Sequence, residues 1–226
     1  MSARGIRSLS VACSVLALGG CGLLPTGNRT TVEIRDVEYG EITVDDGSSV
    51  VDVAGIKNEG YWLRQRGGPE AFGLYVGFSF GEFGAYETFG SELGIDGTPR
   101  VTSGESVDVF IDYDAAAAFY LGDDAAAAPG LPALYADFEC HEFRGRLGAG
   151  VDVNGFQLTL GVAGSKLEGS YGAGSLLGAA DVEISGTNLG GYARAAYADA
   201  GSPLFLEVLG HAGDLSGLTI NGGFRF

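Results

Sequence analysis

Apolar side chains alternate with small or polar ones along much of this 226-residue chain. The clearest case is residues 217–226, where leucine, isoleucine and phenylalanine take even positions while threonine, asparagine and arginine take odd ones. Successive side chains of a strand point to opposite faces, so the pattern predicts strands whose two faces meet different surroundings. Glycine supplies 40 residues and disfavours helix, at about 1 kcal/mol per interior position. We therefore expect an all-β chain.

The small, polar face separates a membrane barrel from a soluble sandwich. A soluble core needs bulky apolar side chains on the inner face of every strand, whereas here the second face is rich in glycine, hydroxyls, amides and charge. The fold we expect is a closed antiparallel up-and-down β-barrel of 8 to 10 strands. Its aliphatic face, including Leu158, Leu160, Phe224 and Phe226, should meet lipid. A soluble barrel with that face inward shows the same alternation and stays open as an alternative.

Turn signals divide the alternating segments. Asn154-Gly155 and Asp46-Gly47 are typical of tight hairpins, so neighbouring strands should be antiparallel. The expected strands are residues 30–44, 48–57, 71–81, 105–113, 142–153, 155–165, 170–184, 189–198, 203–211 and 217–226. The first two are charged enough to form a periplasmic hairpin instead, which would leave eight.

Two stretches lack alternation. Residues 82–104 and 114–131 are expected to be long loops, and whether they plug the lumen is left open. Tyr61 and Trp62 fall in a further expected loop, where we interpret them as anchors at the membrane interface.

The N-terminal segment has the order of a signal peptide. Arg4 and Arg7 precede the largely apolar run 9–18, and Gly19 and Gly20 follow it. The run is about half the ~20 residues that a membrane-spanning helix needs. The expected organisation is a signal peptide (1–20), a tether (21–29) and a single barrel domain (30–226).

Leu18-Gly19-Gly20-Cys21 resembles the lipobox of bacterial lipoproteins. The resemblance implies that lipoprotein-processing machinery cuts before Cys21 and acylates it, and that Gly22, which is not aspartate, permits onward transport to the outer membrane. Several acyl chains, at ~0.8 kcal/mol per buried methylene, hold a protein on a membrane. An ordinary leader with Cys21 left as a thiol is the alternative. If Cys21 is acylated, Cys140 has no partner for an intrachain disulfide in the mature chain.

The chain end carries a second resemblance. Phe224-Arg225-Phe226 is similar to the terminal signal of bacterial outer-membrane barrels, which implies recognition by the barrel-insertion machinery and contact with outer-membrane lipid. Thr219 fits the polar position of that signal. The glycines stand at 222 and 223 instead of 221, which is a departure from the pattern.

Charge restricts the partners. The chain has a net charge of −16, and residues 1–20 contain two arginines and no acidic residue, so the expected mature chain is near −18. Nucleic-acid binding depends on lysine and arginine displacing counterions, which excludes nucleic acid as a partner.

Few residues suggest chemistry. Cys140-His141-Glu142 combines metal-ligand types, but adjacent residues on a strand point apart and no metal-binding spacing supports them. His211 near Ser216 lacks the nucleophile motif of hydrolases. We expect no metal, no cofactor and no catalysis.

Charged residues should occupy the lumen. Arg144, Arg146 and Asp152 share one strand face, and we expect the arginines to pair with Asp108 or Asp112 inside the barrel.

The sequence predicts an outer-membrane β-barrel lipoprotein with a structural, adhesive or narrow-pore role, because eight to ten strands leave a lumen that side chains can fill. A lipid-anchored periplasmic barrel resembling the lipocalins, with a small apolar ligand inside, is the alternative and requires the aliphatic face inward. Oligomeric state and ligand are left open.

Overall fold

The computed structural model describes residues 28–84, 86–104, 106–124, 137–175, 178–198 and 202–225. These residues form a single antiparallel sheet of thirteen strands. The strands are β1 (Arg29–Tyr39), β2 (Ile42–Asp45), β3 (Val50–Val53), β4 (Ile56–Gly67), β5 (Gly73–Phe83), β6 (Tyr86–Gly97), β7 (Arg100–Ser103), β8 (Asp108–Asp124), β9 (Asp137–Val153), β10 (Phe156–Ser175), β11 (Gly178–Tyr197), β12 (Leu204–Gly213) and β13 (Leu215–Arg225). In the described ranges, no helix is both long and apolar enough to cross a membrane.

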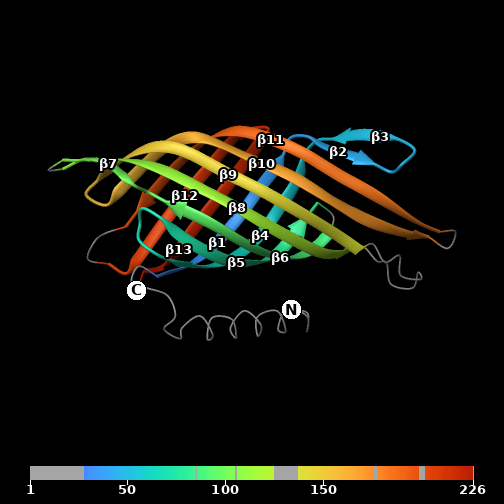
Figure 1. The fold of residues 1–226 in the computed structure, drawn as a ribbon, viewed down its shortest axis with the longest axis horizontal. Helices are drawn as coiled ribbons and strands as arrows, with labels where there is room; N and C mark the ends of the chain where they lie inside the picture. The colour runs from blue at the N-terminus through green and yellow to red at the C-terminus, as the bar shows by residue number, and fades with distance from the viewer. Residues whose placement is uncertain are drawn as a thin grey trace.

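Ten of the strands close into a barrel (Figure 1). The hydrogen-bonded order is β1, β4, β5, β6, β8, β9, β10, β11, β12 and β13, and β13 pairs with β1 to complete the ring. Each strand therefore lies beside its neighbours in this order, and every pair is antiparallel. The predicted closed up-and-down barrel is confirmed, with ten strands.

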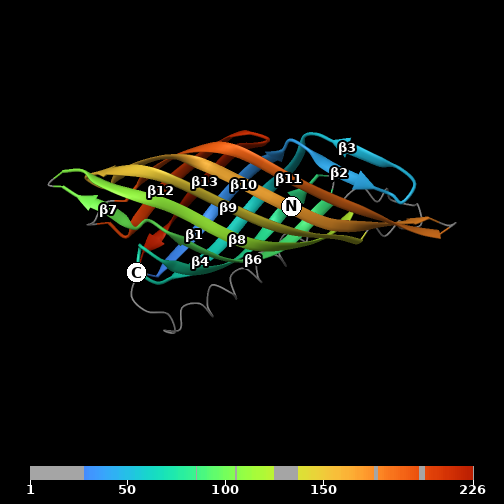
Figure 2. The ribbon, with the colours of Figure 1, turned by 45° about the horizontal axis from the view of Figure 1, so that its top comes forward.

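Three short strands lie outside the ring. β2 and β3 form a hairpin that pairs with residues 183–185 of β11, as Figure 2 shows, while β7 extends the sheet along β8. The alternative in which residues 30–57 form a periplasmic hairpin is wrong in its first half, because β1 is a wall strand. Among the described residues, 42–53 form a hairpin outside the barrel.

The two turn signals form the expected turns. Asn154 and Gly155 join β9 to β10 with φ of 54° and 85°, the left-handed backbone that a two-residue hairpin of this kind needs. Gly47 has φ of 78° in the turn between β2 and β3. Both predicted hairpins are confirmed.

Several expected boundaries are wrong. β6 occupies much of the expected loop 82–104, and β8 continues well into the expected loop 114–131. The expected strand 170–184 spans the end of β10 and the start of β11, which are single strands of 20 residues each. Leu176 and Leu177, which stand between the two strands in the sequence, are not typical turn residues, so the sequence did not indicate where one strand ends and the next begins.

The barrel has two rims. β1 begins and β13 ends at one of them, which we call the terminal rim, together with the turn at 154–155. The opposite rim carries the β2–β3 hairpin and the far ends of β10 and β11, and we call it the hairpin rim. Figure 1 shows β10 and β11 projecting past the other strands on that side.

The aliphatic face points outward. Leu158 is 48% exposed, Leu160 71% and Phe224 53%, which decides the direction of the alternation. Every wall strand contributes at least one exposed apolar side chain, among them Ile34, Tyr61, Val76, Leu93, Ile111, Leu147, Leu160, Leu189, Leu206 and Ile220. We call this surface the exterior belt. A closed antiparallel barrel with ten strands, an apolar exterior and a polar interior is an outer-membrane β-barrel.

The exterior belt ends below the tips of the longest strands. On β10 its apolar side chains run from Phe156 to Val162, and the first charged outward side chain is Lys166, so residues 156–165 approach the ~9 to 11 that a tilted strand needs to cross the hydrocarbon. Lys166 and Glu168, further along the same face, are exposed and form an ion pair at 2.6 Å. The rest of β10 and its partner β11 therefore extend beyond the membrane at the hairpin rim.

Candidate functional site in the lumen

Charged side chains fill the middle of the lumen. Seven arginines and seven acidic residues from the described strands point inward, so the interior is balanced in charge; they are Arg29, Arg35, Arg64, Arg66, Arg144, Arg146, Arg194, Glu33, Glu92, Asp96, Asp112, Asp114, Glu142 and Glu207. Buried ions need partners with good geometry, because their desolvation is costly.

The central network joins opposite walls. Arg64 of β4 pairs with Glu33 of β1 and with Glu92 of β6, and Glu92 pairs in turn with Arg144 of β9. Arg35 donates from Nη2 to Oε1 of Glu33 at 2.7 Å. The Glu92 side chain is fully buried. Four strands are thus tied together across the lumen by charge-assisted hydrogen bonds.

Trp62 packs against this network. Its ring lies 4.7 Å from the guanidinium carbon of Arg35, 5.4 Å from that of Arg144 and 5.9 Å from that of Arg64. Cation–π contacts of this kind favour an arginine held away from water. The expectation of an interface anchor is wrong for Trp62, which is 1% exposed inside the barrel, whereas its neighbour Tyr61 faces outward.

Glu142 of β9 is the second polar centre. Its carboxylate accepts hydrogen bonds from the hydroxyls of Tyr39 at 2.9 Å, Tyr120 at 2.6 Å and Ser165 at 2.9 Å. Asn58 donates to the Tyr120 hydroxyl at 3.0 Å. These side chains come from five strands, so they close the lumen as well as satisfying one buried charge.

A further group of ion pairs lies toward the terminal rim. Arg146 Nε is 3.2 Å from Oδ2 of Asp112, which also accepts from the Tyr192 hydroxyl at 2.7 Å. Arg194 Nε donates to Oε2 of Glu207 at 2.5 Å. Asp96 pairs with Arg29 and Arg66.

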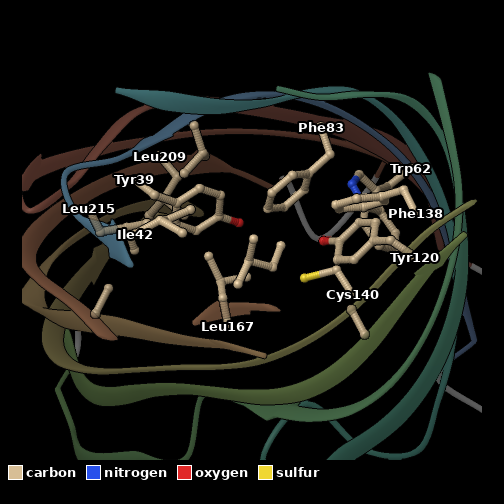
Figure 3. Packing of buried hydrophobic residues seen from close by; sticks show 14 of the residues in the cluster. Tyr39, Ile42, Trp62, Phe83, Tyr120, Phe138, Cys140, Leu167, Leu209 and Leu215 are labelled. Atoms are coloured by element: carbon tan, nitrogen blue, oxygen red, sulfur yellow. The ribbon is translucent and has the colours of Figure 1, made fainter. Parts of the chain in front are cut away.

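Aromatic side chains seal the lumen toward the hairpin rim. The Phe83 ring has its centroid 5.6 Å from that of Tyr39, 5.5 Å from that of Tyr120 and 5.3 Å from that of Phe138. Figure 3 shows these rings reaching into the lumen from opposite walls, with Leu167 between them. We call this group, Tyr39, Phe83, Tyr120, Phe138 and Leu167, the aromatic seal.

Free space in the lumen is divided into small cavities. Among the described residues, one of about 110 Å³ lies by Arg66 and Arg194, and one of about 60 Å³ lies by Arg35 and His211. A wider recess of about 640 Å³ opens at the terminal rim. A water needs on the order of 10–15 Å³ of such space, so each of these cavities has room for water molecules.

Glycines make room for the large inward side chains. A Cβ on Gly77 would lie 2.5 Å from Oε1 of Glu92, and one on Gly161 would lie 2.5 Å from Cε1 of Tyr192. Outward glycines differ, since a Cβ on Gly222 would meet nothing within 4 Å. Part of the glycine content is therefore explained by the packing of a crowded lumen.

The structure brings two of the three expected lumen charges into the network. Arg144 and Arg146 lie in the lumen, and Arg146 pairs with Asp112, whereas Asp108 pairs with Arg100 at the terminal rim. Asp152 lies apart from them beside the β9–β10 turn, where it accepts from the amide of Gly155 at 2.9 Å and from Gln157 at 2.9 Å.

The other expected sites fall partly outside the described residues. Phe224 is exposed on the exterior belt, paired across the ladder with Thr30 and Leu204. Cys21 and Phe226 lie outside the described residues, as do the whole of the expected signal peptide and most of the expected tether. Within the described part of the chain, no group of three or more histidine, cysteine or acidic residues could hold a metal ion.

Sequence reasoning missed most of the network. Glu33 and Arg35 fell in an expected strand that was left open as part of a periplasmic hairpin, while Arg64, Arg66 and Glu92 fell in expected loops. A signal existed in β6, where Thr88, Gly90, Glu92 and Gly94 alternate with Phe89, Leu93 and Ile95. Ser91 interrupts the apolar residues on the outward face of β6. In β4, the large aromatic Trp62 interrupts the small and polar residues on the inward face.

Comparisons with known proteins reveal likeness in outline only. No family model matches the chain, and no curated protein matches it in sequence. Among solved structures, the translocator domain of the autotransporter NalP from Neisseria meningitidis is 13% identical with a TM-score of 0.42, covering 97% of this chain and 96% of its own. The Ralstonia pickettii toluene transporter TbuX is 10% identical with a TM-score of 0.31 and 90% coverage of each chain. The fold assignment rests on the strand order and the exterior belt described above.

Proposed function

We propose that this chain is a lipid-anchored barrel of the bacterial outer membrane with a structural or adhesive role, and that its lumen is sealed. The observation that carries this proposal is the network around Glu92, which ties β1, β4, β6 and β9 together across the lumen. For a ten-stranded barrel to conduct ions, these side chains would have to move away from the barrel axis. The aromatic seal adds a second barrier toward the hairpin rim.

The connections support an orientation. The terminal rim has the two-residue turn 154–155, residues 68–72 and the longer connection 98–107 that carries β7. The hairpin rim has the one-residue connection at Asp214 but also the longest described connection, residues 40–55 with the β2–β3 hairpin, and the projecting ends of β10 and β11. Outer-membrane barrels have short periplasmic turns and longer external loops. The hairpin rim therefore faces outward from the cell in this proposal, and the projecting sheet is the surface on display.

The same orientation suits the expected lipid anchor. β1 begins at Arg29 on the terminal rim, eight residues after Cys21. Eight residues span at most about 29 Å, enough to connect acyl chains in the inner leaflet to this rim. The anchor would then attach the chain to the inner leaflet beside the terminal rim, in addition to the exterior belt.

The exterior belt provides no support for the lipocalin-like alternative. That function requires the aliphatic face to line a cavity, whereas Leu158, Leu160 and Val162 are exposed and the lumen is charged. The absence of catalysis stays a prediction.

Refolded protein in a planar bilayer is expected to show no stepwise ionic current, because charged and aromatic side chains occupy the lumen. A water-filled porin refolded in the same lipid is the positive control. Steady single-channel conductance from this chain would contradict the sealed lumen and restore a narrow-pore role.

Membranes from cells that produce Cys21→Ala protein are expected to keep it in the pellet after a carbonate or urea wash, because the exterior belt holds the barrel in lipid without acyl chains. The protein with Cys21 intact should also incorporate labelled palmitate, and the Cys21→Ala variant should not. Release of the variant by the wash would show that the anchor alone held the chain.

A further inference from the structure

The β2–β3 hairpin ends the sheet with an unprotected edge. β3 pairs with β2 on one side, and no described strand pairs with its other side. All four residues of β3 are exposed, with Val50 at 64% and Val51 at 53% although their side chains point to opposite faces. Both faces and one edge of this strand are therefore open to water.

The backbone groups on that edge can be assigned from the ladder. Asp46 N donates to Ser49 O at 3.2 Å, and the register continues through Val44 with Val51 and Ile42 with Val53. Antiparallel ladders alternate hydrogen-bonded and non-hydrogen-bonded pairs, so the N–H and C=O of Val50 and Asp52 point away from β2. These four groups are a template for another strand.

β3 lacks several of the usual protections of an edge strand. Natural sheets protect their edges with short strands, charged side chains (lysine above all), proline, bulges or a covering segment. β3 is short and carries Asp52, but no described segment covers it. β3 has neither lysine nor proline, and its register with β2 is continuous. β7, the other exposed four-residue strand, begins with Arg100 and has a register shift against β8.

The hairpin is strongly acidic and held in shape. Residues 41–55 contain four acidic residues, Glu41, Asp45, Asp46 and Asp52, and no lysine or arginine. The Asp46 carboxylate accepts from the Ser48 hydroxyl at 2.7 Å and from the amides of Ser48 and Ser49 at 2.8 and 2.7 Å. These hydrogen bonds, that from the Ser48 side chain first, lower the pKa of Asp46 to about 2, so this carboxylate stays ionised in mildly acidic solution as well as at neutral pH.

We propose that β3 is an acceptor edge for an extended segment of a partner protein in which lysine or arginine alternates with apolar residues. Val50 and Asp52 share one face of β3, whereas Val51 and Val53 share the other. A segment with cations on the Asp52 face and aliphatic side chains on the Val51 face matches both. A second copy of this chain does not fit, because two hairpins would bring eight acidic side chains together.

This inference rests on the proposed function in taking the hairpin rim as the displayed surface. The two can fail separately, since strand binding is measured in detergent micelles and conductance in bilayers. Binding together with channel activity would overturn the sealed lumen and leave the acceptor edge standing.

The test is the fluorescence anisotropy of a labelled ten-residue peptide that alternates lysine and valine, titrated with the full chain in micelles. Saturable binding is expected, at least tenfold weaker when alternate backbone nitrogens of the peptide are methylated, because the charge is unchanged and only strand addition is blocked. A peptide alternating glutamate and valine should also bind at least tenfold more weakly. Equal binding of the methylated peptide, or of the glutamate peptide, would overturn the proposal.

Variants of the chain locate the site. Val50→Pro removes an outward N–H that β2 does not use and should weaken binding about tenfold, whereas Val50→Ala should change it less than twofold. Val101→Pro places the same change in β7 and should leave binding unaltered. Asp52→Asn leaves the backbone intact and should weaken binding severalfold, which keeps the test decisive if proline disturbs the hairpin. Unchanged binding in both Val50→Pro and Asp52→Asn would exclude β3.

Discussion

Replacing Glu92 with alanine is expected to lower the free energy of unfolding by about 3–5 kcal/mol, the cost of leaving buried ions without a partner. Arg64 and Arg144 both pair with this carboxylate, whose side chain is fully buried. Glu33 would still face Arg64, but Arg144 would keep only Glu142, at 3.7 Å from Oε2. Urea unfolding in detergent, followed by the fluorescence of the single tryptophan, measures the change, because Trp62 contacts both arginines.

Two variants separate charge from shape in this experiment. Glu92→Gln keeps the size and one acceptor, so an intermediate loss of stability is expected. Glu87→Ala removes an exposed carboxylate from the same strand and should change stability by less than about 0.5 kcal/mol. If Glu92→Ala unfolded at the same urea concentration as Glu87→Ala, the central network would contribute nothing to stability.

The fold was predictable because alternation is a local property. In the first half of β10 and in the last residues of β13, the outward positions are mainly aliphatic or aromatic and the inward ones mainly small or polar, so strand and face can be read there from the sequence. The turn at Asn154-Gly155 was predictable for the same reason, since two residues determine it.

The lumen was less predictable because its contacts are not local. Arg64 and Glu92 are 28 residues apart and meet only after β4, β5 and β6 have paired in a particular register and the barrel has closed. Trp62 is a large aromatic on the inward face, where alternation expects a small or polar residue. It is stabilised there by Arg64 of its own strand and by Arg35 and Arg144 from other strands. Alternation reports which side of a strand is inward but carries no information about the partners across the lumen.

Leu160→Arg is expected to destabilise the barrel by about 2–4 kcal/mol in lipid vesicles, because an arginine at the bilayer midplane loses hydration. Leu160 is the most exposed residue of β10 within the exterior belt, and it is preceded and followed on that face by Leu158 and Val162. Reversible unfolding in urea from vesicles of fixed thickness gives the free energy.

Phe156→Arg is the matched control, because Phe156 lies on the same face of β10 at the terminal rim. Near the membrane interface an arginine costs about 0–1 kcal/mol, so the two variants should differ by a clear margin. A soluble barrel would place both arginines in water and show no dependence on depth. Equal, small losses of stability at both positions would therefore contradict the contact between the exterior belt and lipid. A larger loss at Leu160 than at Phe156 places Leu160 in the hydrocarbon, and the charged lumen is then the interior of a membrane protein.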